Sequence, residues 1–443
     1  MKNLIIYAAS AMFALTACNA LDIIPSDSYS DPVVWQDQNL IKMYVNDQYN
    51  ALVGQDNFYR YSFFSDEVYQ KYNDEGCNYI RENILTSDNV GSVSDVLNYW
   101  NTGYGYLHKV NMFFENIESS RVDEEFKNTM INEMKFIRAF IYFRLIRSYG
   151  GVPIIKEVYD INSDWSNVKR NTYNECVEYI ISDLDDVIAN LPDRPSERNR
   201  VGANAARALK SRVLLYNASA LNNPDNDKER WQKASDAAKE LLDKGYSLCD
   251  NYREMFFDVT NNEYIFAKEF SETYSHMLGF NLACTGDGGR GWATPSQNLV
   301  DAYETLDGEI PVLNSESGDI NPKSIYNPEK PYENRDPRFY DCIYYNGSTS
   351  LNGRIVETFK DGADMIQQDM TMTGYYCRKF VNENEPVSQS HHYTTPFPFF
   401  RLAEIYLNYA EAINESEGPV AEAYDAVNII RKRSGIMQKQ SSN

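Results

Sequence analysis

The longest stretch with a dense helical pattern of apolar residues runs from Glu133 to Pro153. Apolar side chains recur there at helical spacing and fill most of the remaining faces (Met134, Phe136, Ile137, Phe140, Ile141, Tyr142, Phe143, Leu145 and Ile146). Glu133, Arg144 and Arg147 form a narrow polar seam on this helix. A helix that is apolar nearly all round must be covered by protein on most sides. Gly150 and Gly151 favour a left-handed helix end and Pro153 prevents continuation, so the stretch predicts a buried central helix with a defined end.

Amphipathic patterns on either side predict further helices. They occupy residues 35–49, 93–119, 201–220, 231–244, 399–414 and 421–433. Thr172 and Glu175 form a capping box that opens another helix, which ends near Leu191. The many alanines of residues 201–220 allow close approach between helices. The pattern therefore predicts antiparallel helix pairs similar to tetratricopeptide repeats, although no clean repeat of that period is present.

The character of the chain changes between residues 246 and 397, where Gly, Asn, Asp, Tyr and Pro are frequent and helical periodicity is weak. Within this part, residues 262–267 have the composition of a short strand. Loops this extensive in a compact fold usually carry function. We therefore predict a mainly α fold, with a helical scaffold at about 33–245 and 398–434 and a loop-rich, ligand-side insertion with short strands at about 246–397.

The N-terminus has the pattern of a secretory signal peptide. Lys2 precedes an apolar run from Leu4 to Leu15, which is too short to span a bilayer stably. The run leads into Leu15-Thr16-Ala17-Cys18, the pattern of a bacterial lipobox in which the cysteine is acylated. A coincidental cysteine after an ordinary signal peptide is the alternative, which the spacing disfavours. We predict a signal peptide at residues 1–17 and a single domain at 18–443, tethered to lipid through Cys18.

The formal net charge of −22 argues against a nucleic-acid partner, whose phosphates would be repelled. It also argues against a basic patch for anionic lipid, whereas it is compatible with a neutral ligand. The chain holds 34 Tyr against 21 Phe, which indicates many half-buried or exposed rings. A helical core rich in tyrosine and a ring-lined binding surface both account for this excess.

Six cysteines besides Cys18 show no C-x-x-C spacing, so no zinc or thioredoxin-like site is predicted. An even number in an exported chain permits disulfides. A core of this size needs none, however, and we predict free, mostly buried thiols.

Motifs for catalysis are missing from the sequence: no G-x-S-x-G, H-E-x-x-H or Walker pattern occurs. The glycines of Gly286–Gly291 indicate a flexible loop, since no Lys-Ser/Thr follows them. Three acidic residues near one another could hold calcium, but they lack the glycine and final glutamate of an EF-hand (Asp225, Asp227 and Glu229). We therefore predict no catalytic residue, no metal site and no cofactor.

Carbohydrate stacking is the binding chemistry that the residues favour. The apolar face of a sugar packs on an aromatic ring, and its hydroxyls need polar partners nearby. Trp292 lies in the glycine-rich loop together with Arg290 and Asp287, which supply both kinds of group. The alternative is that Trp292 packs the loop onto the core, and the sequence alone favours neither.

Several motifs resemble those of the SusD/RagB family. Residues 136–153 fit F-x-R-A-x-x-Y-F-x-L followed by Y-G-x-V-P, and residues 401–412 read R-L-A-E-I-Y-L-N-Y-A-E-A. Further family-like positions follow in order (Leu21-Asp22 after Cys18, residues 65–67, 231–246, 294–301 and 335–339, Asn428, Arg431 and Arg433). The resemblance therefore covers nearly the whole mature chain.

The resemblance implies a non-catalytic lipoprotein on the outer face of the outer membrane. It would capture glycans and pass them to a SusC-like TonB-dependent transporter, over which it forms a lid. It also implies that the early aromatic loops lie near the ligand, which adds three candidate contacts whose alternative is packing beneath the loops (Tyr69, Tyr72 and Tyr79). Two other functions stay open: peptide binding, as in the RagB branch, and a structural lid without ligand affinity. An enzyme is the least favoured.

One departure concerns the C-terminus. Family members usually continue past the helix that contains Asn428 and Arg431, whereas this sequence stops at Asn443. We therefore expect a chain that is short at this end, with consequences for packing of the last helices and for partner docking.

Overall fold

The structure is a computed structural model that describes residues 31–52, 59–70, 76–93, 97–160, 162–366 and 370–439. The predicted signal peptide, the lipidation site Cys18 and the candidate contact Tyr72 lie outside these ranges.

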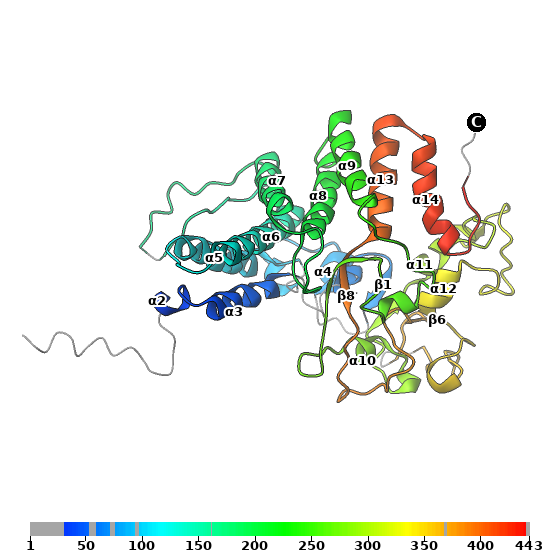
Figure 1. Ribbon diagram of the computed structural model, residues 1–443. Helices are drawn as coiled ribbons and strands as arrows, with labels where there is room; N and C mark the ends of the chain where they lie inside the picture. Colours follow the sequence, from blue (N-terminus) through cyan, green and yellow to red (C-terminus); the bar gives the residue numbers. More distant parts are fainter. Residues whose placement is uncertain are drawn as a thin grey trace, which may run out of the picture.

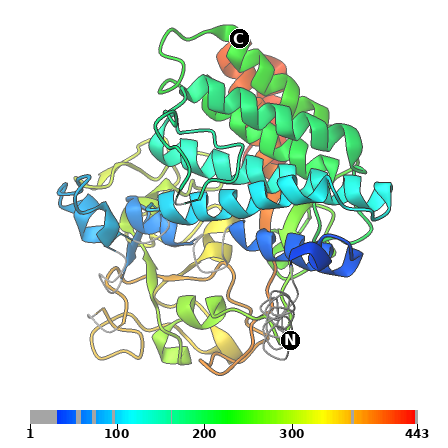
Figure 2. The same cartoon turned by 90° about the vertical axis from the view of Figure 1, so that its left-hand side faces the viewer.

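Long helices form one stack that passes through the molecule (Figures 1 and 2). They are α3 (Gln38–Gln48), α5 (Trp100–Ile117), α6 (Glu124–Tyr149), α7 (Tyr173–Asn190), α8 (Ala203–Ala218), α9 (Lys228–Leu242), α13 (Leu402–Glu417) and α14 (Ala421–Arg433). From α5 onward each helix packs against the next one in this order, including α9 against α13. The mainly helical, tetratricopeptide-like architecture predicted from the sequence is confirmed.

The buried central helix is α6, and it is longer than the predicted stretch because it begins at Glu124. The Asp123 side chain caps it by accepting a hydrogen bond from the Phe126 amide at 2.9 Å, and Gly150 ends it with φ 71°. Two of the three residues of the polar seam are themselves buried, since Glu133 is 1% and Arg144 5% exposed. Neither α6 nor any other helix in the described ranges is long and apolar enough to cross a membrane.

The capping box at the start of α7 is present as predicted. The Thr172 hydroxyl accepts from the Glu175 amide at 3.2 Å, and the Glu175 carboxylate accepts from the Thr172 amide at 2.7 Å. These reciprocal bonds satisfy two backbone donors that a helix start leaves without partners.

Short elements make up the part of the chain between α9 and α13. Its strands, together with β1, which follows α3 in the sequence, form two-stranded antiparallel sheets. The pairs are β1 (Val68–Gln70) with β3 (Ala293–Pro295), β2 (Tyr264–Lys268) with β8 (Phe397–Arg401), β4 (Val312–Asn314) with β5 (Asp319–Ile320), and β6 (Ile343–Tyr344) with β7 (Tyr376–Cys377). Short helices lie among them and near the N-terminus: α2 (Asp31–Val34), α4 (Cys77–Arg81), α10 (Leu278–Leu282), α11 (Gln297–Ala302) and α12 (Pro337–Cys342). The strand predicted at residues 262–267 is β2, shifted by two residues at its start.

The carboxylate of Glu263 ties the entry and exit of this loop-rich part to the helices. Its side chain is fully buried, and Oε1 accepts from Arg401 at 2.8 Å. Oε2 accepts from Arg433 of α14 at 3.0 Å and from the Cys249 amide at 3.0 Å. Glu263 stands just before β2, and Arg401 ends β8, so one buried anion joins three distant segments.

The hydrophobic core is divided between the helices and the loop-rich part. The main cluster lies along the helical stack, and it includes Phe266 of β2 together with Phe399 and Phe400 of β8. A second cluster lies under the loops around Phe63, Leu278 and Trp292. The β2–β8 pair therefore packs as part of the helical core, whereas β1 and β3 belong to the smaller one.

The cysteines bear out the prediction of free, mostly buried thiols. All six in the described ranges are free, four of them buried and two half-buried. Burial is the main cause that raises the pKa of Cys176 and of Cys284, and it raises the pKa of Cys377 to about 12.

We predict that these thiols resist alkylation while the protein is folded. Only the thiolate reacts with iodoacetamide, and at pH 8 a thiol with a pKa near 12 is almost wholly protonated. Mass spectrometry of a form that begins after Cys18 should find Cys176, Cys284 and Cys377 unlabelled, and all six labelled in guanidinium. Fast labelling of Cys377 in the folded protein would contradict this.

Candidate functional site

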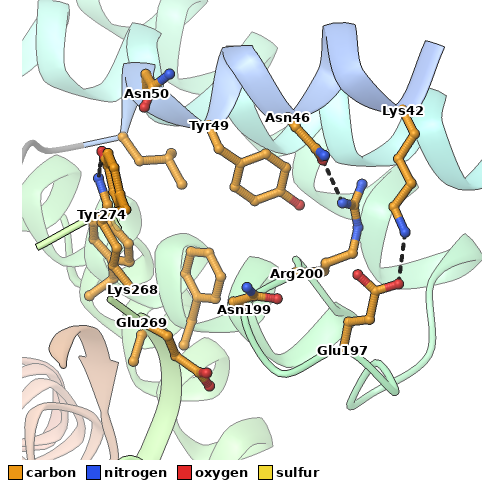
Figure 3. Close-up of a pocket in the computed structure, with 14 residues that line it drawn as sticks. Lys42, Asn46, Tyr49, Asn50, Glu197, Asn199, Arg200, Lys268, Glu269 and Tyr274 are labelled. Carbon is orange, nitrogen blue, oxygen red and sulfur yellow. Dashed lines mark hydrogen bonds and ion pairs between the residues drawn. The ribbon is translucent and has the colours of Figure 1, made fainter. Parts of the chain in front are cut away.

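A pocket of about 440 Å³ opens where α3 faces β2 and the loop between α7 and α8 (Figure 3). Four separate segments of the chain form its wall: residues 42–52, 197–200, 266–274 and Phe399. Tyr274 and Lys268 lie at one end of the view in Figure 3, and Lys42 and Glu197 lie at the other. The pocket therefore joins the helical stack to the start of the loop-rich part.

Aromatic rings form the apolar part of the wall. Phe266 and Phe399 come from neighbouring strands, and their rings stack with centroids 5.1 Å apart and planes 22° apart. Both are buried, whereas the Tyr274 side chain is 48% exposed. Tyr274 stacks on Phe270, with centroids 5.9 Å apart, and its hydroxyl accepts from Lys268 Nζ at 3.0 Å. An exposed, oriented ring thus stands beside an ammonium group.

The opposite side of the wall is polar and already hydrogen-bonded. Arg200 donates through Nη1 to Asn46 Oδ1 at 2.7 Å and through Nε to Glu133 Oε1 at 2.8 Å. The Tyr49 hydroxyl donates to Glu133 Oε2 at 2.9 Å. Burial raises the pKa of Glu133, and the bonds from Arg200 and Tyr49 oppose this only in part. This internal network holds the wall in place.

Such a pocket can bind a ligand that has both apolar faces and hydroxyl groups. Concave sites of this kind combine apolar rings with a few fixed polar groups that set orientation. Asn199 lines the pocket, and its side chain makes no hydrogen bond to any other residue in the described ranges. Amide groups that remain available suit the hydroxyls of a sugar or the backbone of a peptide.

The pairing of β1 with β3 brings the early aromatic loop beside the glycine-rich loop. Tyr69 lies opposite Thr294 in the antiparallel register, two residues beyond Trp292. The structure thus places two groups of predicted ligand contacts on one part of the molecule, and the described ones do not line the pocket of Figure 3. A contact between segments so distant in sequence was not predicted.

Trp292 packs the loop onto the smaller core cluster. Its side chain is 6% exposed, and its ring centroid lies 6.4 Å from that of Phe63. The guanidinium carbon of Arg290 lies 4.3 Å from the ring centroid, and that of Arg60 lies 5.4 Å from it. Of the two interpretations of Trp292, the structure shows the packing one. Little ring surface is left for a sugar, and a ligand contact by Trp292 or Arg290 remains a prediction.

Asp287 supports the glycine-rich loop from inside. Its side chain is 3% exposed, and Oδ1 accepts from Arg354 Nε at 2.6 Å and from the Ser350 hydroxyl at 3.1 Å. Arg354 also donates to Asp364 at 2.5 Å, and the Asp364 side chain is fully buried. Burial lowers the pKa of Arg354, but the bonds to both carboxylates more than offset this and raise it. In this conformation Asp287 is buried, and its Oδ1 accepts hydrogen bonds from within the protein.

Of Tyr69 and Tyr79, the two predicted tyrosine contacts that the structure describes, Tyr69 presents the exposed ring. Its side chain is 38% exposed, and the guanidinium carbon of Arg81 lies 4.5 Å from the ring centroid. Tyr79 is half-buried on α4. A ring flanked by a cation fits the predicted stacking chemistry, so Tyr69 remains the best placed of the sequence-derived candidates.

Of the three acidic residues considered for calcium, Asp227 has a structural role. It caps α9 by accepting from the Glu229 amide at 3.0 Å. Two loop histidines also have polar neighbours, since His391 lies 3.4 Å from Glu385 and His392 Nδ1 lies 3.0 Å from the Ser275 hydroxyl. Within the described ranges, no group of three or more His, Cys, Asp or Glu side chains could hold a metal ion.

Comparison with known proteins identifies the family. The model of the SusD family matches residues 262–443, and a second model, described as starch-binding and associating with the outer membrane, matches residues 19–215. The chain belongs to the SusD/RagB family. This confirms the family predicted from the motifs at residues 136–153 and 401–412.

Curated relatives share low but extended similarity with this SusD-like chain. The SusD-like protein P2 of Formosa agariphila is 22% identical over 80% of this chain and 65% of the relative. The starch-binding protein SusD of Bacteroides thetaiotaomicron is 24% identical over 77% of this chain and 64% of the relative. The chain thus spans slightly less than two thirds of the length of these relatives.

Solved structures agree with the fold. A SusD-like protein from Bacteroides fragilis is 29% identical and superposes with a TM-score of 0.76, over 94% of this chain and 82% of that one. A SusD-like carbohydrate-binding protein from the same species is 22% identical, with the same TM-score of 0.76 over 93% and 81% of the two chains. The SusD-like helical fold is therefore confirmed.

We predict that Arg354→Ala destabilises the protein strongly. Removing the guanidinium leaves the Asp287 and Asp364 carboxylates buried without their cation. Breaking a buried pair in this way costs about 3–5 kcal/mol in the free energy of unfolding. Urea denaturation measures this cost. The control is Lys330→Ala, which breaks a pair whose side chains are 59% and 58% exposed and should cost less than about 1 kcal/mol. Equal losses would contradict the role of Arg354.

Proposed function

We propose that this chain is a non-catalytic, cell-surface glycan-binding lipoprotein. It captures oligosaccharide or polysaccharide and delivers it to a SusC-like TonB-dependent transporter of the outer membrane. Family membership supports this, together with the starch binding named for the SusD relative. The observation that carries the proposal is the exposed Tyr274 ring at a pocket with amide, ammonium and carboxylate groups.

Capture would use stacking and hydrogen bonds alone. A sugar ring packs on Tyr274, while its hydroxyls bond to groups such as Lys268, Glu269 and Asn199. Each such hydrogen bond contributes a net of roughly 0.5–1.5 kcal/mol, because water is displaced from both partners. A few contacts of this size give reversible binding, which a protein that passes its ligand on requires.

The same proposal includes a lipid tether at Cys18 and an orientation toward the outside of the cell. The Leu15–Cys18 pattern supports acylation of that cysteine. Several acyl chains on one cysteine anchor a protein firmly, since each buried methylene contributes about 0.8 kcal/mol. The acidic body would then stay in solution beside the transporter.

We predict saturable glycan binding that depends on Tyr274. Calorimetric titration of a form that begins after Cys18 with a panel of neutral and acidic polysaccharides measures it. Tyr274→Ala should weaken binding about tenfold, which corresponds to about 1.4 kcal/mol. The control Trp165→Ala removes a ring that is 52% exposed on the connection between α6 and α7, outside both candidate surfaces, and should leave binding unchanged.

Two further variants separate the candidate surfaces. Loss of binding in Tyr69→Ala or Trp292→Ala, with Tyr274→Ala unaffected, would move the site to the β1–β3 surface and keep the function. Binding to peptides alone would indicate peptide uptake. Affinity for the transporter without any ligand would indicate a structural lid. Release of shortened products would contradict the absence of catalysis.

A further inference from the structure

A second pocket, of about 290 Å³, lies between the C-terminal end of α6 and β8, and it is rich in arginine. Four guanidinium groups line it (Arg144, Arg147, Arg212 and Arg401), together with a single carboxylate, Glu404. The rest of the wall is largely aromatic, and Phe399 belongs both to this pocket and to the pocket of Figure 3. In a chain with a net charge of −22, such a concentration of positive charge needs an explanation.

Two of the four arginines are neutralised within the fold. Arg212 forms a bidentate pair with Glu404, with Nε and Nη2 each 2.6 Å from a carboxylate oxygen. Arg401 pairs with the buried Glu263 at 2.8 Å. The one carboxylate in the pocket therefore neutralises Arg212, and the buried Glu263 neutralises Arg401.

Arg144 and Arg147 have no carboxylate within 4 Å in the part of the chain that the structure describes. Arg144 is 5% exposed. It donates through Nη1 to the Ala51 carbonyl oxygen at 3.3 Å, and its guanidinium carbon lies 3.5 Å from the Tyr99 ring centroid. Its Nε is buried without a hydrogen-bond partner among the described residues. Arg147 donates through Nη2 to the hydroxyl of Tyr61 at 2.7 Å, which is a neutral partner.

A buried guanidinium without a counter-ion is unfavourable, because desolvation is not repaid by an opposite charge. The negative end of the α6 dipole compensates only a fraction of that cost. An arginine pair with available N–H donors is the arrangement that recognises carboxylate, sulfate and phosphate oxygens, often in a bidentate manner. Since no described residue supplies a carboxylate to this pair, the pocket suits an oxyanion that a ligand brings.

We propose that this pocket binds the oxyanion of an acidic sugar unit, a uronate carboxylate or a sulfate ester, with Arg147 and Arg144 as its partners. The inference rests on the proposed glycan-binding function and narrows its ligand class to acidic glycans. The aromatic wall packs against the apolar face of the same sugar unit. Since Phe399 lines both pockets, an acidic unit bound here lies next to the first pocket.

The test compares matched charged and uncharged ligands at constant ionic strength. One pair is an oligogalacturonate and its fully methyl-esterified form, and the other is a dextran sulfate oligosaccharide and plain dextran. Calorimetric titration should detect binding of the charged member of at least one pair, tenfold or more tighter than its uncharged partner. A difference within the galacturonate pair identifies a carboxylate as the group recognised, and a difference within the dextran pair identifies a sulfate.

The variant series assigns the binding to this pocket. Arg147→Ala should weaken binding of the charged ligand at least tenfold, and Arg147→Lys should restore part of it. The control Arg170→Ala removes an exposed arginine outside this pocket and should change affinity less than twofold. Arg147 is exposed, so its variants should fold, and thermal unfolding checks that they do.

Three outcomes would overturn the inference. Equal weakening by Arg147→Ala and Arg170→Ala would indicate attraction by charge alone. Tighter binding of a glutamate oligomer than of either acidic glycan would assign the pocket to acidic peptides. Binding of neutral glycans alone would refute this inference and leave the proposed function standing, whereas a folded protein that binds no glycan at all would refute both.

Discussion

The buried carboxylate of Glu263 is the constraint on which the arrangement of the two parts depends. It lies where the chain leaves the helical stack for the loop-rich part, and its partners Arg401 and Arg433 lie where the chain has returned. An isolated two-stranded sheet is marginally stable in water. The β2–β8 pair persists because it packs on α6 and because Glu263 fixes its end with charge-assisted hydrogen bonds.

The helices could be predicted because the signals that form them are local. Apolar spacing along residues 133–153, the capping box at Thr172 and the glycine at 150 each act within a few residues of their position. The start of α6 was missed because its first turns are polar, and the cap at Asp123 lies outside the apolar run. The pairing of β1 with β3 had no local signal, since its strands have three residues each and lie over 200 positions apart.

The candidate site shows where sequence reasoning ends. The loop around Trp292 is polar and rich in glycine, which indicates exposure, but its Asp287 carboxylate is buried and neutralised by Arg354. Arg354 lies in another segment, and no sequence motif identifies it as the partner. The pocket of Figure 3 draws on four segments, so no motif contains it. Arg144 and Arg147 did stand out as polar positions on an apolar helix, but only the fold shows that no carboxylate of the described residues lies within 4 Å of them.

The pairing of β2 with β8 has an evolutionary consequence. Lys268 and Phe397 are paired positions in this sheet, so the chain segment between them begins and ends at neighbouring points. The entropy cost of closing a loop rises only slowly with its length. Insertions or deletions in the exposed loops of this segment would leave most of the helical stack undisturbed, whereas exchange of the whole segment would also remove Glu304, the partner of Arg431 in α14. The helical stack thus acts as a fixed frame that holds a segment whose exposed loops can vary in length and sequence.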